Sequence, residues 1–115
     1  MLWVMVYHQL LAERVRNQLA GTPGLTERQM FGGIGWMIFG NMAVGVLGEG
    51  IVCRVGPDAY EALLAEPGAA VFDFTGRPMT GWLHVHADAL DDEEALQEWI
   101  DHGVRFASGL PAKAK

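Results

Sequence analysis

The side chains most able to do chemistry lie in the C-terminal part of the sequence: Arg77, His84 and His86. Residues 82–86 alternate in polarity as a β-strand does, so both imidazoles are expected on one face of a sheet. Two imidazoles on one face can bind a metal ion together when a third ligand completes the site. Arg77 stands in a turn between a glycine and a proline, where its guanidinium can hold a carboxylate or a phosphate in a bidentate pair.

The same three residues also have structural interpretations. Two imidazoles on a sheet face are often simply exposed, and no other His, Asp or Glu stands at a spacing that connects it to them. Arg77 can pair with an internal acid such as Asp73. The sequence therefore predicts no metal site, no cofactor and no catalytic residue. The alternative is a small-molecule or metal-binding domain that uses a pocket near Arg77, His84 and His86.

The glycines, the cysteine and the serine that could form a phosphate-binding loop or act as a nucleophile are not in the sequence context that these roles need. Gly32, Gly33 and Gly35 lead into a strand-like run, whereas a phosphate-binding glycine loop leads into a helix. Cys53 lies in an apolar strand-like run, which indicates a small core residue and not an activated thiol. Ser108 is the only serine and lies beside the C-terminal tail. We therefore expect a non-enzymatic domain.

Length, charge and cysteine content further limit the class of protein that this sequence can encode. The chain has 115 residues, half of them apolar, which fits a single folded domain over residues 1–115. Its net charge is −6, and this disfavours nucleic-acid binding because phosphate neutralisation needs a basic surface. One cysteine excludes an intrachain disulfide and a zinc site built on several thiolates.

Charge is divided unevenly along the chain. Residues 1–55 carry four basic and three acidic side chains, whereas residues 56–115 carry four basic and eleven acidic ones. Seven of these acids fall between Asp88 and Asp101, where no Lys or Arg interrupts them. This run is typical of a solvated helix face, and it also suits docking of a basic partner.

The N-terminus combines an apolar leader with an amphipathic helix. Residues 1–6 are apolar, but no basic residue precedes them and the run is too short for a secretory signal. No stretch approaches the roughly 20 apolar residues that span a bilayer, so we expect a cytoplasmic protein. Tyr7, Leu11, Val15 and Leu19 recur every four residues and predict a helix from about residue 3 to residue 20.

Glycine-punctuated apolar runs follow between residues 25 and 55. They predict four antiparallel strands, with a type II′ turn at Gly40-Asn41 and a second hairpin at Gly48-Glu49-Gly50. We expect these strands to be apolar on one face only, the face that the helices cover.

The second half continues with a short helix, two strands and a long helix. Pro57 is expected at the first turn of a helix over residues 58–65. Strands are expected at residues 71–74 and 82–86. Asp91 is the expected N-cap of the last helix, with Glu94 three residues on. That helix ends at Gly109 and Pro111, and residues 110–115 are expected to form a frayed tail.

These elements predict an α+β fold. Sequential hairpins imply antiparallel pairing, and the two terminal helices must cover the apolar face of the sheet. The expected architecture is therefore a two-layer sandwich with an antiparallel sheet of about five to six strands.

Three segments also resemble a known family. Met30-Phe-Gly-Gly-Ile-Gly-Trp, followed by Gly40-Asn-Met and by Gly76-Arg-Pro-Met-Thr-Gly-Trp, is similar to the N-terminal domain of the TfoX/Sxy family over about residues 7–107. The residues that match its pattern are Met30, Phe31, Gly32, Gly33, Gly35, Gly76, Arg77, Met79, Trp82 and Trp99. The resemblance implies an α+β architecture similar to that of secretion chaperones.

The resemblance also implies a regulatory role. Full-length members of the family regulate competence genes together with the cyclic-AMP receptor protein and carry a second, helical domain. We expect this chain to be the N-terminal domain without that second domain. The family offers no established catalytic residue to transfer. We therefore expect a regulatory or protein-interaction module that forms a homodimer, contacts a regulatory protein and binds neither nucleic acid nor membrane.

Overall fold

The computed structural model describes residues 8–30, 32–73 and 76–113, and it is an α+β fold in two layers. The strands are Leu25–Met30 (β1), Gly33–Ile38 (β2), Asn41–Leu47 (β3), Gly50–Arg54 (β4), Ala69–Val71 (β5) and Trp82–His86 (β6). The helices are Gln9–Leu19 (α1), Tyr60–Leu64 (α2) and Glu93–Ser108 (α3), with a 3₁₀ turn at Ala87–Leu90 (η1).

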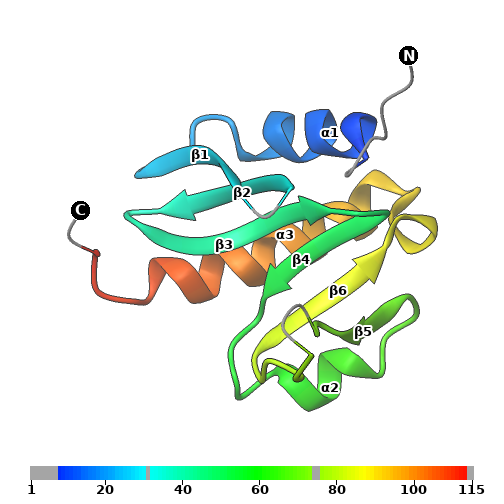
Figure 1. The fold of residues 1–115 in the computed structure, drawn as a ribbon. Coiled ribbons are helices and arrows are strands. Elements are labelled where there is room, and N and C mark those ends of the chain that lie inside the picture. Colours follow the sequence, from blue (N-terminus) through cyan, green and yellow to red (C-terminus); the bar gives the residue numbers. More distant parts are fainter. Residues whose placement is uncertain (1–7, 31, 74–75, 114–115) are drawn as a thin grey trace.

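All six strands form one antiparallel sheet in the order β1-β2-β3-β4-β6-β5. Figure 1 shows α3 crossing behind this sheet, α1 beside β1 and β2, and α2 at the β5–β6 end. The structure thus confirms the predicted sandwich. In the described part of the chain, no helix combines the length and the apolar character needed to cross a membrane.

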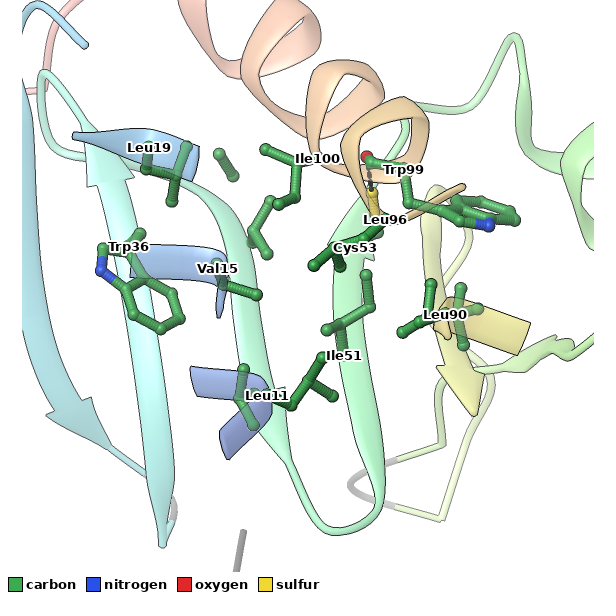
Figure 2. Packing of buried hydrophobic residues seen from close by; sticks show 14 of the residues in the cluster. Leu11, Val15, Leu19, Trp36, Ile51, Cys53, Leu90, Leu96, Trp99 and Ile100 are labelled. Carbon is green, nitrogen blue, oxygen red and sulfur yellow. Dashed lines mark hydrogen bonds between the residues drawn. The ribbon is translucent and has the colours of Figure 1, made fainter. Parts of the chain in front are cut away.

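The main core lies between the sheet and the two long helices. Leu11, Val15 and Leu19 of α1 are each at most 1% exposed, as the four-residue spacing predicted. They pack with Trp36 of the sheet, while side chains of α3 such as Ile100 fill the other half of the core (Figure 2). Burial of each such side chain contributes about 1.5–3 kcal/mol, which makes this packing the chief source of stability.

The β2–β3 hairpin turns one residue earlier than predicted. Ile38 is paired with Asn41, so the turn residues are Phe39 and Gly40. Both have positive φ, 49° and 86°, which is the pattern of a type I′ turn and not of the predicted type II′ turn. Asn41 is therefore the first residue of β3 and not a turn residue. Its buried side chain donates a hydrogen bond from Nδ2 to the carbonyl of Pro111, 2.8 Å away.

The chain end is tied to this turn. The backbone N–H of Lys113 donates to the carbonyl of Phe39 at 2.8 Å, beside the bond from Asn41 to Pro111. Residues 111–113, which we expected to be frayed, therefore have defined partners. Residues 114 and 115 lie outside the described residues.

The first helix begins later than predicted. The backbone at His8 is extended, and its ring Nδ1 accepts a hydrogen bond from the N–H of Leu11 at 3.1 Å. This side-chain cap starts α1 at Gln9, not near residue 3. Tyr7 and the apolar leader lie outside the described residues.

The boundaries of α2 and β5 also differ from the prediction. Pro57 starts a turn that precedes α2, so the helix begins at Tyr60 and not at residue 58. The strand expected at residues 71–74 lies earlier, because Ala69 pairs with Val85 and the ladder ends at Val71. Phe74 lies outside the described residues.

The last helix also starts one residue later than predicted. The η1 turn extends to Leu90, and Asp91 is itself helical in conformation, so it cannot act as the cap. Asp92 has the extended backbone of an N-cap, and its Oδ1 accepts from the N–H of Glu94 at 3.0 Å. Gly109 ends the helix as predicted.

One polar cluster links α1, β1 and β2. The carboxylate of Glu27 accepts from Nε and Nη2 of Arg16, each at 2.8 Å, and from the indole N–H of the buried Trp36 at 3.0 Å. The bonds from Arg16, followed by the bond from Trp36, lower the pKa of Glu27 below its usual value, although burial opposes them. The carboxylate thereby satisfies the only polar atom of the Trp36 side chain.

We expect Glu27→Gln to lower the free energy of unfolding by about 1 kcal/mol at pH 7. The pKa of Glu27 is lower in the folded state, so its stabilisation is present above the unfolded pKa and is lost as pH falls through the folded pKa. Urea unfolding at pH 7 and at pH 3 should therefore show a difference between wild type and variant that shrinks in acid. Glu13→Gln on the exposed face of α1 is the control, and a pH-independent difference for Glu27→Gln would contradict the assignment.

Candidate functional site

Of the three residues proposed from sequence, His84 and His86 lie on β6 and Arg77 lies in the connection that precedes it. Arg77 is exposed in the connection from β5 to β6. His84 is half-buried, with its Nε2 3.1 Å from the carbonyl of Leu47. His86 is exposed, and its Nδ1 accepts from the N–H of Asp88 at 3.1 Å, which caps η1. His84 and His86 thus have structural contacts, and their role toward a ligand stays a prediction.

No group of three or more His, Cys, Asp or Glu side chains among the described residues is placed to hold a metal ion. Cys53 is buried, and its Sγ lies 3.0 Å from the carbonyl of Trp99 (Figure 2). Burial raises the pKa of the Cys53 thiol to about 12, so the thiol is neutral at physiological pH. This confirms the prediction that Cys53 is a core residue.

The face of the sheet turned away from α1 and α3 is also apolar in its centre. All six residues of β2 are buried, and Val52 of β4 is only 3% exposed although it points away from the helices. Met42 and Gly45 of β3 lie on this same face. The expectation that the strands are apolar on one face only is therefore wrong for β2, β3 and β4.

A pocket of about 220 Å³ opens on this second face. We call it the methionine pocket; it is lined by Met30, Ile34, Met42, Gly45, Val46, Leu47, Val52, Phe72, Met79 and Trp82. The connection between β5 and β6 supplies Phe72 and Met79 (Figure 1). This connection is held by two backbone hydrogen bonds, from Met79 to Phe72 and from Trp82 to Met79, both 3.0 Å long.

Two facing glycines leave room for the methionines. Gly35 and Gly45 are directly paired across β2 and β3. A Cβ added at Gly45 would lie 2.8 Å from Cε of Met42, and one added at Gly35 would lie 3.0 Å from Sδ of Met30. The flat glycine pair therefore lets both thioether side chains lie across the strands.

The three segments that carry the family resemblance meet at this pocket. Met30 comes from the first segment, Met42 from the second, and Met79 and Trp82 from the third. Gly32 and Gly76 have positive φ, 80° and 88°, so they serve the backbone of the two turns.

The other residues of the pattern have separate places. Gly33 allows close strand contact, because an added Cβ would clash with the carbonyl of Val46. Trp99 is buried on α3, on the other side of the sheet. Phe31 lies outside the described residues. Sequence reasoning noted the pattern, which includes Met42, but missed the pocket, since Val52 and Phe72 carry no motif and the motifs do not show that their segments meet.

A cation borders the methionine pocket. Arg54, at the end of β4, is the direct neighbour of Trp82 on β6. Its guanidinium carbon lies 5.0 Å from the centroid of the Trp82 ring and 5.3 Å from that of Phe106. Burial lowers the pKa of Arg54, but an arginine side chain keeps its charge at neutral pH.

An antiparallel α+β sandwich with an apolar pocket on its second face defines the class of this domain. The sequence model of the TfoX N-terminal domain matches residues 17–107. The chain belongs to the TfoX N-terminal domain family. No curated protein matches the sequence.

We expect Gly45→Ala to destabilise the protein by about 1 kcal/mol. Overpacking against Met42 and the Ile34 carbonyl costs roughly 1–3 kcal/mol, and the lost flexibility of the unfolded chain returns about 0.4–1 kcal/mol. The control is Gly109→Ala, because φ there is −83° and the nearest atom to an added Cβ is 3.6 Å away. Equal effects of the two substitutions in chemical denaturation would contradict the close packing inferred at Gly45.

Proposed function

We propose that the domain is a non-enzymatic protein-interaction module with a regulatory role, and that the methionine pocket receives one bulky apolar side chain of a partner protein. The observation that supports this most is the meeting of the three family segments around one apolar pocket, to which they contribute Met30, Met42, Met79 and Trp82. Burying a Leu or Phe side chain there is worth about 1.5–3 kcal/mol. An anchor of this kind is a common basis of binding between proteins.

The lining supports binding of a partner and not a reaction. None of the ten lining side chains ionises, so the pocket itself offers no general acid, base or nucleophile. Three of the ten are methionines, whose flexible thioethers adapt to differently shaped apolar groups. A surface of this type suits a partner side chain that enters from solution.

A small apolar molecule is the second candidate. The pocket holds about 220 Å³, and an apolar cavity of about 150 Å³ is enough to bind benzene. The pocket suggested by sequence near Arg77, His84 and His86 is a different location, because none of the three lines the methionine pocket.

Met79→Glu tests the proposal, because it places a carboxylate in the pocket from a connection outside the sheet. We expect the tagged wild-type chain to capture a specific partner from its own cells, and Met79→Glu to lose that partner at least tenfold, since burial of a carboxylate opposes docking. Leu10→Glu is the matched control, because Leu10 is 67% exposed on α1. Capture of the same proteins by all three chains, each shown to be folded by circular dichroism, would contradict the proposal.

We also propose that the module forms a homodimer through the outer edge of β1. Among the described residues β1 pairs with β2 alone, and the four central residues of β1 are exposed, so its edge can accept a second strand. Sedimentation velocity should then show a species of twice 12.6 kDa at micromolar concentration. A strictly monomeric species up to the highest soluble concentration would disprove the dimer.

A further inference from the structure

Arg54 is a cation that contacts two aromatic rings, Trp82 of the pocket lining and Phe106 of α3. Its guanidinium lies over the rings of Trp82 and Phe106, at 5.0 and 5.3 Å. None of the ion pairs between described residues includes Arg54. The side chain is only partly exposed, so water compensates its charge incompletely.

The position of Arg54 relates it to the methionine pocket. Val52 lies two residues earlier on the same face of β4, and Trp82 lies directly opposite on β6. Both residues line the pocket. Arg54 therefore stands at the rim, one same-face step of about 6.6–6.8 Å along the strand from Val52.

The rings leave the guanidinium ready to bind an anion. Aromatic neighbours contact the guanidinium through its flat face, whereas its N–H groups point outward in the plane. A carboxylate that approaches in this plane accepts two hydrogen bonds in fixed geometry. The ten lining residues carry no charged group, so Arg54, which contacts the lining residue Trp82, can orient a molecule bound there.

We propose that the methionine pocket and Arg54 together bind a partner-protein segment in which a bulky apolar residue is followed two positions later by Asp or Glu. Side chains two residues apart in an extended segment lie on one side, at the same spacing that separates Val52 from Arg54. The net charge of −6 disfavours a strongly acidic partner, so the segment carries one carboxylate at this place and not an acidic run. This inference rests on the proposed function.

Methyl NMR of the methionines tests the inference directly, because Met30, Met42 and Met79 line the pocket. The probes are three blocked peptides in a Gly-Ser frame that contain Phe-Gly-Glu, Phe-Gly-Gln or Gly-Gly-Glu. We expect Phe-Gly-Glu to shift the three methyl signals of the full chain most strongly. Phe-Gly-Gln should bind at least tenfold more weakly, because a charge-assisted hydrogen bond contributes about 1.5–3 kcal/mol.

Arg54→Gln completes the comparison. It should weaken Phe-Gly-Glu about tenfold and leave Phe-Gly-Gln unchanged, which isolates the Arg54–carboxylate contact. Arg105→Gln is the matched control, because Arg105 is an exposed arginine of α3, the helix that packs on the opposite face of the sheet. Equal binding of Phe-Gly-Glu and Phe-Gly-Gln would overturn the role of Arg54 and leave the anchor pocket intact.

Other outcomes separate this inference from the proposed function. Absence of methyl shifts with either Phe peptide would overturn both the anchor pocket and the inference. Free 3-phenylpropanoate that binds as tightly as Phe-Gly-Glu would assign the site to a small carboxylate and overturn the peptide. If the substitution Trp3→Ser moves the pocket methyl signals of the free chain, the occupant of the pocket is the chain's own apolar leader, residues 1–6. This result would also overturn the peptide proposal.

Discussion

Burial of the central strands on both faces is the constraint on which the other elements depend. One face of β2, β3 and β4 packs against α1 and α3, where Gly103 allows α3 to approach the carbonyl of Ala43. The second face is covered only in part, by the connection that carries Phe72 and Met79. The apolar surface beside this connection forms a pocket, because none of the helices among the described residues packs over it.

This partial cover explains why the candidate site is apolar and adaptable. A helix packed there would have completed a third layer, whereas a short connection leaves Met42 and Val52 facing an open space. Methionine fills such a space loosely and changes shape at little cost. Arg54 can orient a bound molecule at the rim of the pocket, because its guanidinium contacts Trp82, which is also a lining residue.

Local patterns were sufficient for the elements and insufficient for their ends. The four-residue spacing of Leu11, Val15 and Leu19 predicted the buried stripe of α1, since helix geometry alone places these side chains on one face. The ends depended on competition between neighbouring turns. Phe39 adopts a positive φ because the pairing of Ile38 with Asn41 requires it, and η1 moves the cap of α3 to Asp92. Neither the pairing nor η1 leaves a periodic signal in the sequence.

By itself, the sequence determined the α+β class, the antiparallel meander, the core position of Cys53 and the family to which the chain belongs, because periodicity, glycine turns and the three family segments are local properties. Only the tertiary structure decided that these segments meet. Met30 and Met79 are far apart along the chain, and the strand order that places β6 beside β4 brings them to one face. Burial of that face and the place of Arg54 at its rim follow from strand register, which depends on long-range pairing.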